Sequence, residues 1–182
     1  MYPRQKLKGY QTIRFEVEPG KFVEHVITNL AHLYVDADHA RDTRTRKSIT
    51  SIAAAIYGVI VHWIMAKQTC VAAHSTDAEI RAYYSGVQLN KYLRCVQTFL
   101  RHDMTKPTII YEDNQAALDI MAAGHITSRV KHMAVPIAIC HEDIKAGNSE
   151  GHKILGILNP SDLGTKPLPA SSFHRQSRQL RG

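Results

Sequence analysis

Tyr34-Val-Asp-Ala-Asp38 is the stretch that decides the fold, because it places a carboxylate, Asp36, at the end of a short β-type run. Three more carboxylates follow in distinctive settings: Glu79 in Ser-Thr-Asp-Ala-Glu, Asp113 in Tyr-Glu-Asp-Asn-Gln, and Asp162 in Pro-Ser-Asp-Leu-Gly-Thr-Lys-Pro-Leu. Each of the four ends a predicted strand or opens a predicted helix. Two divalent cations about 4 Å apart need several hard oxygen ligands. The set therefore predicts a metal-dependent nuclease.

Each carboxylate also has a structural interpretation, which the sequence leaves open. Asp36 and Asp113 could cap the turn or helix that follows, a role that Asp fills well. Thr76-x-x-Glu79 has the spacing of a capping box, and on spacing alone this favours capping for Glu79. The metal interpretation rests on the whole set, because ligands of open α/β sheets gather at strand carboxyl ends and four unpaired carboxylates repel one another.

The order of the predicted elements favours an α/β fold, a mixed sheet flanked by helices. Apolar alternation and short apolar runs predict strands, and helical spacing of apolar residues predicts helices. Predicted strands cover residues 13–17, 31–35, 49–60, 61–65, 108–111 and 154–158. Predicted helices cover residues 74–102, 114–123 (stopped by Gly124) and 129–146 (kinked or begun at Pro136), with a closing helix entered at 159–161.

Length and composition are typical of a single globular domain. The chain has 182 residues, and we expect a domain over 11–170 between an N-terminal arm (1–10) and a basic C-terminal tail (171–182), both mobile. Three distant cysteines indicate neither a disulfide framework nor a zinc site. The longest apolar stretch, 52–60, is too short to span a membrane, and the N-terminus has no secretory signal. We expect an intracellular protein.

The net charge of +7 favours a polyanionic partner, because Lys and Arg neutralise phosphates and release counterions. A basic protein without such a role is the alternative. The basic residues that could follow a phosphate backbone are Arg44, Arg46, Lys47, Arg129 and Lys131.

Taken together, the motifs resemble the ribonuclease H domain of copia-type (Pseudoviridae) LTR retrotransposon polyproteins. The resemblance covers about residues 30–170, and the motifs run in the family's order. They are Asp36-Ala-Asp38, Arg46-Lys-Ser48, His62-Trp63, Lys67-Gln68, Ser75-Thr-Asp-Ala-Glu79, Asp113-Asn-Gln115, Arg129-x-Lys131-His132 and Asp162-x-x-Thr165-Lys-Pro-Leu168.

The resemblance implies a ribonuclease H-like fold: a five-stranded mixed sheet with helices on both faces. Its first three strands would be antiparallel and its last two would add alongside, with residues 10–29 supplying the first strand. It also implies that four residues are catalytic and hold two Mg²⁺ ions, for which Mn²⁺ could substitute. These residues are Asp36, Glu79, Asp113 and Asp162.

The implied reaction is hydrolysis of the RNA strand in an RNA–DNA hybrid, beside a reverse transcriptase domain of the same polyprotein. Asp36 would bridge the two ions, Glu79 and Asp113 would hold one of them, and Asp162 would hold the ion that carries the nucleophile. The place of action would be the cytoplasmic virus-like particle, or the nucleus. Candidate nucleic-acid contacts are Arg46, Lys47, Ser75, Asn114, Gln115, Arg129, Lys131 and His132. Helix capping is the alternative role for Asn114, Gln115 and above all Ser75, and a solvated helix start is the alternative for Lys131-His132.

The chain departs from the family pattern at a few positions. His39 stands where the family usually has Trp, and Ala134 and Ala138 stand where it commonly has an acidic residue and a His. These changes leave two other readings open: a ribonuclease H-like module that binds nucleic acid or a protein without cutting, and another nuclease or integrase of the superfamily. The four carboxylates themselves favour the active enzyme.

Overall fold

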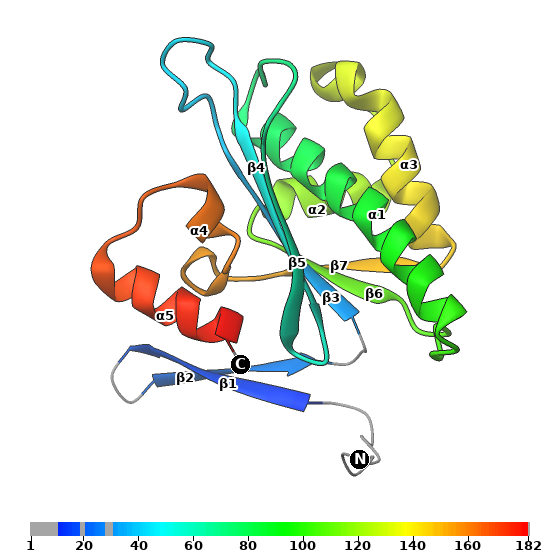
Figure 1. Cartoon of the computed structure of the whole chain (residues 1–182). Helices are drawn as coiled ribbons and strands as arrows, with labels where there is room; N and C mark the ends of the chain where they lie inside the picture. Colours follow the sequence, from blue (N-terminus) through cyan, green and yellow to red (C-terminus); the bar gives the residue numbers. More distant parts are fainter. Residues whose placement is uncertain (1–10, 19–20, 28–30, 182) are drawn as a thin grey trace.

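The structure, a computed structural model, describes residues 11–18, 21–27 and 31–181. Its centre is a five-stranded sheet of order β5-β4-β3-β6-β7 (Figure 1). Strand β3 pairs antiparallel with β4 and parallel with β6, β4 pairs antiparallel with β5, and β6 pairs parallel with β7. The strands are β3 (Ala31–Asp38), β4 (Ile49–Ile56), β5 (Val59–Lys67), β6 (Thr108–Glu112) and β7 (Ser149–Lys153). The expected mixed sheet is confirmed.

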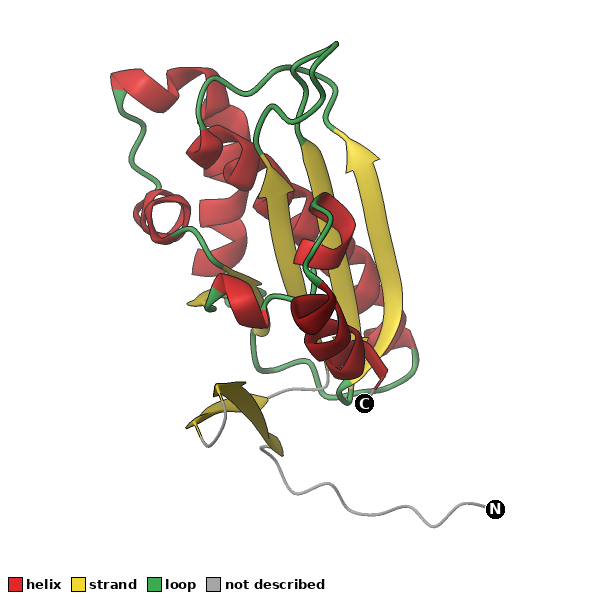
Figure 2. Ribbon diagram, turned by 90° about the vertical axis from the view of Figure 1, so that its left-hand side faces the viewer, coloured by secondary structure: helices red, strands yellow, loops and turns green. Residues whose placement is uncertain are grey.

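Helices cover both faces of this sheet (Figures 1 and 2). On one face α1 packs on β3 and α3, and α2 packs on α3; on the other, α4 contacts β4 and α5 contacts β5. The helical elements are α1 (Ser75–Phe99), α2 (Gln115–Ala123), η1 (Ser128–Met133), α3 (Ala134–Lys145), η2 (Gly156–Leu158), α4 (Asp162–Thr165) and α5 (Ala170–Arg181). Pro136 lies in the first turn of α3, where a proline is tolerated.

Strand β3 is buried on both faces, which explains its nearly continuous apolar sequence. Leu33 and Val35 belong to the larger core beneath α1, whereas Tyr34 belongs to a second core on the opposite face. Helix α1 approaches β3 closely at Gly86, where an added Cβ would lie 2.8 Å from Val35 Cγ1. This close approach sets the position of the helix that carries Glu79.

The expectation that residues 10–29 supply the first strand of the main sheet is wrong. Strands β1 (Gln11–Glu18) and β2 (Lys21–Ile27) pair with each other in a separate two-stranded antiparallel sheet (Figure 2). Strand β3 is the first strand of the main sheet, and both of its edges are taken by β4 and β6. The alternating sequence of residues 13–17 did predict a strand, and this strand is β1.

The last strand is also shifted from its predicted place. It is Ser149–Lys153, whereas the predicted run 154–158 contains the 3₁₀ turn η2 and contributes Ile154 and Leu158 to the second core. An edge strand is held by backbone bonds to one neighbour and so needs no apolar signature. The 171–182 stretch, expected to be a mobile tail, forms α5 up to Arg181. Residues 1–10 lie outside the described residues, so the proposed domain limits stay a prediction.

Candidate metal centre

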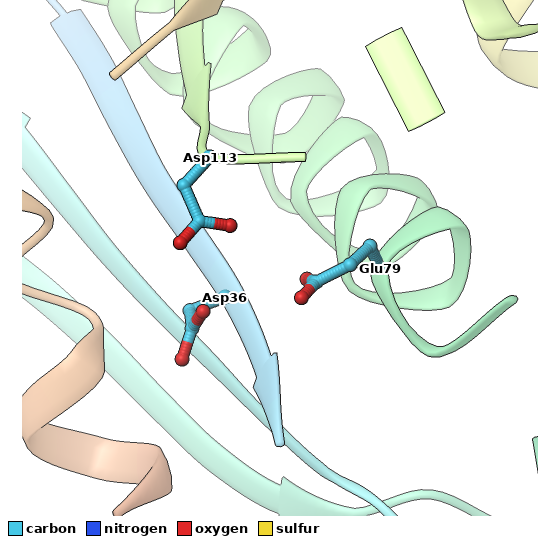
Figure 3. A group of neighbouring side chains, drawn as sticks. All are labelled: Asp36, Glu79 and Asp113. Carbon is cyan, nitrogen blue, oxygen red and sulfur yellow. The ribbon is translucent and has the colours of Figure 1, made fainter. Parts of the chain in front are cut away.

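Three of the four predicted carboxylates converge at one edge of the sheet. One oxygen each from Asp36, Glu79 and Asp113 lies within 4.8 Å of the other two, and the side chains point toward one another (Figure 3). Asp36 lies near the end of β3 and Asp113 directly follows β6. Because Tyr34 and Tyr111 are partners in this parallel pair, the residues two positions further on lie side by side. The predicted convergence of these three is therefore present.

Glu79 reaches the cluster from α1, and it does not form the predicted capping box with Thr76. The helix begins at Ser75 after His74, so Thr76 lies inside the first turn, and Asp77 instead accepts a 3.2 Å hydrogen bond from Ala73 N. Glu79 accepts a bond from the Ala37 backbone N–H. The helix was predicted from residue 74 and begins at Ser75, so its start was correct to within one residue. Only the cap differs, because Ser and Thr are the preferred N-caps and His is not.

The environment of Glu79 strongly opposes its ionisation. Burial, and then the nearby charges of Glu112 and Asp36, raise its pKa to about 11. Glu79 Oε2 is buried and has no hydrogen-bond partner among the described residues. Such a carboxylate is stabilised by a cation, since a cation removes both the charge repulsion and the unsatisfied lone pairs.

Asp36 is buried at the centre of the cluster. Burial raises its pKa to about 7, the Thr165 hydroxyl bond lowers it, and Asp162 raises it. Thr165 Oγ1 donates a hydrogen bond to Asp36 Oδ2 and lies 3.3 Å from the Asp162 carbonyl. The neighbouring Asp38 ends β3, and its carboxylate lies 3.6 Å from Arg41 Nε, outside the carboxylate group.

Asp162, the fourth predicted ligand, lies beside Asp36 but not within the three-carboxylate group. Its Oδ1 is 2.6 Å from Lys166 Nζ. Burial lowers the pKa of Lys166, but the bond to Asp162 and the charge of Asp36 outweigh it, so the pKa is raised. The assignment of Asp162 as a metal ligand stays a prediction.

The segment that carries Asp162 is fixed to β3 by two side chains. Asn159 Nδ2 donates to the Val35 carbonyl at 2.8 Å, and Ser161 Oγ donates to the Tyr34 carbonyl at 2.7 Å. These two bonds lie at the end of the pairing between β3 and β6, whose last partners are Tyr34 and Tyr111. They hold α4 next to Asp36.

Two residues of this region were not singled out from the sequence. Glu112, the last residue of β6, is fully buried; burial first, and then the charges of Asp113 and Asp36, raise its pKa well above the usual range. Its Oε1 accepts a 2.9 Å bond from Asn114 N. Lys166 stood within a recognised motif, and its spacing of four residues from Asp162 was the signal that could have indicated its partner. Glu112 adds a buried carboxylate next to the centre, and its position beside Asp113 was the only sequence signal for this.

The polar candidates for substrate contact have mixed surroundings. Asn114 caps α2, since its Oδ1 accepts a 3.1 Å bond from Ala117 N. Gln115 donates a 2.8 Å bond to Asp119 on the exposed face of the same helix. Ser75 is exposed and does not cap α1, where the cap position is His74. Asn114 thus has the helix-capping role that was its alternative to nucleic-acid contact. Contact of Ser75, Asn114 or Gln115 with nucleic acid stays a prediction.

The basic candidates lie in two segments that neighbour the centre. Arg46 and Lys47 are in the loop between β3 and β4, and Arg129, Lys131 and His132 are in η1, which contacts α1. His132 Nε2 lies 2.8 Å from Asp77 Oδ2, and this pair joins η1 to the first turn of α1. Arg129 and Lys131 are exposed, as a role in phosphate contact would require.

The donor set fits a hard divalent cation. All three converging groups are carboxylates, without His or Cys, and oxygen ligands of this kind suit Mg²⁺ or Mn²⁺. None of the three forms an ion pair with Lys or Arg in the described part of the chain. A bound cation would supply the missing positive charge.

Sequence relatives of the chain are retrotransposon polyproteins. It is 32% identical over 141 residues to the retrovirus-related Pol polyprotein from transposon TNT 1-94 of Nicotiana tabacum, covering 77% of this chain and 10% of the relative. The chain is 27% identical over 161 residues to the retrovirus-related Pol polyprotein from transposon RE2 of Arabidopsis thaliana, covering 88% of this chain and 11% of the relative. The chain therefore spans about a tenth of the length of the curated relatives it matches.

Solved ribonucleases H share the fold. LC11-RNase H1, isolated from compost by a metagenomic approach, gives a TM-score of 0.58 at 15% identity, covering 76% of this chain and 94% of that one. RNase H1 from the archaeon Halobacterium salinarum gives a TM-score of 0.52 at 13% identity, covering 74% of this chain and 93% of that one. The chain belongs to the ribonuclease H domains of copia-type Pol polyproteins.

No protein-family model matches this copia-type ribonuclease H domain. In its described part, none of the helices has the length and apolar character that crossing a bilayer requires. The family assignment confirms the resemblance that the motifs indicated, from Asp36 to Leu168.

Proposed function

We propose that this domain is an endoribonuclease that hydrolyses the RNA strand of RNA–DNA hybrids with the help of two divalent cations. The convergence of Asp36, Glu79 and Asp113 within 4.8 Å carries the proposal. The ribonuclease H family assignment supports the reaction class. Mg²⁺ is the expected ion, with Mn²⁺ as a substitute.

The chain's own residues would hold the cations and place the scissile phosphate. Asp36, Glu79 and Asp113 offer converging oxygens, and Asp162 lies next to Asp36 as a further ligand. When bound, a pair of divalent cations activates the attacking water and stabilises the leaving 3′ oxygen. Thr165 holds the Asp36 carboxylate through its hydroxyl, so this side chain is oriented before any ligand arrives.

Recognition of the hybrid would combine the 2′-hydroxyl and the phosphates. The 2′-hydroxyl distinguishes RNA from DNA, and Asn114, Gln115 and Ser75 are the candidate polar contacts. Arg46, Lys47, Arg129, Lys131 and His132 are the candidates for backbone contact. The sequence relatives are whole Pol polyproteins, which supports a reverse transcriptase domain of the same polyprotein as a partner. A retrotransposon particle as the place of action follows from the proposed reaction alone.

The test is cleavage of a hybrid labelled on the RNA strand, with Mg²⁺ or Mn²⁺, by the wild type and by Asp113→Asn. We expect cation-dependent cutting of the RNA by the wild type and none by the variant. Absence of cutting by the wild type, with hybrid binding retained, would favour a non-catalytic binding module. Cutting of duplex DNA instead would favour a different nuclease of the superfamily.

A further inference from the structure

We propose that Lys166 is an internal counter-ion of the carboxylate centre, which competes with a divalent cation for Asp162. The inference deepens the proposed function and rests on it. It explains why three predicted ligands converge while the fourth, although adjacent, is bound to an ammonium group.

The contact between Lys166 and Asp162 engages an oxygen that the proposed function assigns to a cation. Lys166 Nζ lies 2.6 Å from Asp162 Oδ1, one helical turn away, and the Asp162 side chain is nearly fully buried. No other described Lys or Arg forms an ion pair with any of the four predicted ligands. The ammonium thus supplies positive charge where the cluster otherwise has only carboxylates.

The ammonium can leave without disturbing the fold. The Lys166 side chain is 41% exposed, so its flexible stem can move the charge into solvent. Thr165, its neighbour, donates a hydrogen bond to Asp36 and is buried, which keeps the backbone of this segment in place. These adjacent residues therefore act on different carboxylates: Thr165 positions Asp36, and Lys166 neutralises Asp162.

The two positive groups exclude each other at this site. An ammonium and a divalent cation about 4 Å apart repel strongly, even at the dielectric constant of water. A cation that uses Asp162 must therefore displace Lys166, and its apparent affinity is reduced by the free energy of the lost ion pair. We expect loss of the Lys166 charge to tighten cation binding about tenfold or more.

Titration of Mg²⁺ and Mn²⁺ into the full chain by calorimetry, without nucleic acid, tests this. The variants are Lys166→Gln, Lys166→Arg and, as a matched control, Lys67→Gln. Lys67 forms a comparable exposed ion pair with Asp42, at 45% exposure, so its loss changes the net charge equally without removing an ion-pair partner of the four predicted ligands. Tighter binding by Lys166→Gln, with Lys166→Arg and Lys67→Gln near the wild type, is the expected result.

A second background separates competition at Asp162 from a general charge effect. In Asp162→Asn, replacement of Lys166 by Gln should no longer change the cation affinity. A gain of the same size in that background would overturn the proposal, as would equal affinities of the wild type and Lys166→Gln. If the wild type binds neither cation, the proposed function fails together with the Lys166 proposal. If the wild type binds a cation but Lys166→Gln binds it no more tightly, only the Lys166 proposal fails.

Discussion

At the scale of single residues, the centre is defined by three converging carboxylates that form no ion pair with a described Lys or Arg, beside a fourth, Asp162, that pairs with Lys166. Asp36 is the most central of them, since it lies beside Asp113 and Asp162 and accepts the Thr165 hydroxyl bond. Asp38, two residues away, has similar chemistry but pairs with Arg41. The two aspartates therefore form a natural comparison of a central residue with a peripheral one.

Asp36→Asn should abolish cation-dependent cleavage of the hybrid and leave the fold intact. The amide keeps the shape of the side chain and removes one charge from a repulsive cluster, so the melting temperature should not fall. We expect a rate loss of at least about a hundredfold, or about 2.7 kcal/mol of transition-state stabilisation. Asp38→Asn is the control and should retain activity. Equal activity of both variants would contradict the assignment.

The stability of the cation-free protein should fall as the pH rises. Burial and neighbouring charges raise the folded-state pKa of Asp36 to about 7 and that of Glu79 to about 11. The folded state then binds more protons than the unfolded state, so stability is fully present below the unfolded pKa values and is lost toward the folded ones.

Melting temperatures between pH 5 and pH 9 in excess chelator measure this loss, and Glu79→Gln should flatten the profile. Saturating Mg²⁺ should stabilise most at the upper end, because the carboxylates must ionise to bind it. A melting temperature that rises with pH in chelator would contradict the assigned burial of these charges.

At the scale of elements, the centre depends on how closely α1 lies against β3. Glu79 reaches Asp36 only because Gly86, in the middle of α1, has no Cβ to meet the buried Val35. The helix is therefore a positioning element, and its distance from the strand is set by one residue two turns away from the ligand.

Gly86→Ala should destabilise the protein by about 1 kcal/mol and weaken cation binding. Overpacking of a buried contact costs about 1–3 kcal/mol, and the higher helix propensity of Ala offsets about 1 kcal/mol of that. Gln88→Ala, at an exposed position of the same helix, is the control and should change neither property. Urea unfolding and cation titration are the measurements. An unchanged cation affinity for Gly86→Ala would show that this contact does not set the ligand position.

The elements also show where sequence patterns carry structural information. Strand β3 was predictable because burial on both faces gives a continuous apolar run, and the convergence of three carboxylates followed from their positions at strand and helix ends. The polar strand β7 had no such signal, since backbone bonds to β6 and a buried hydrogen bond from Ser149 to Asp143 hold it. The bond of Thr165 could not be predicted, because a contact between residues 36 and 165 leaves no local pattern. The pair of Asp162 and Lys166 does have a local signal, since the two residues are four positions apart.

At the scale of the whole molecule, the excess of basic over acidic residues favours a polyanion as partner. Two basic segments neighbour the centre: the loop between β3 and β4, and η1. A hybrid bound across the centre would lie within reach of both. Binding should then depend on counterion release and weaken as salt is added.

Lys131→Gln should weaken hybrid binding at every sequence and reduce the slope of log affinity against log salt by about 1. Lys145→Gln is a matched control, because Lys145 is exposed at the far end of α3, about 18 Å along the helix axis from its start. Fluorescence anisotropy of a labelled hybrid at several salt concentrations measures both slopes. A flat salt response of the wild type would count against a nucleic-acid groove.

The position of α4 in the chain has a consequence for protein synthesis. All five strands of the main sheet end by Lys153, yet Asp162, Thr165 and Lys166 come later in the chain. A growing polypeptide can thus complete its sheet and its first three ligands while the carbonyls of Tyr34 and Val35 still await Ser161 and Asn159. The sheet is finished before the centre is. Synthesis therefore supplies every residue of the main sheet before the last residues of the centre.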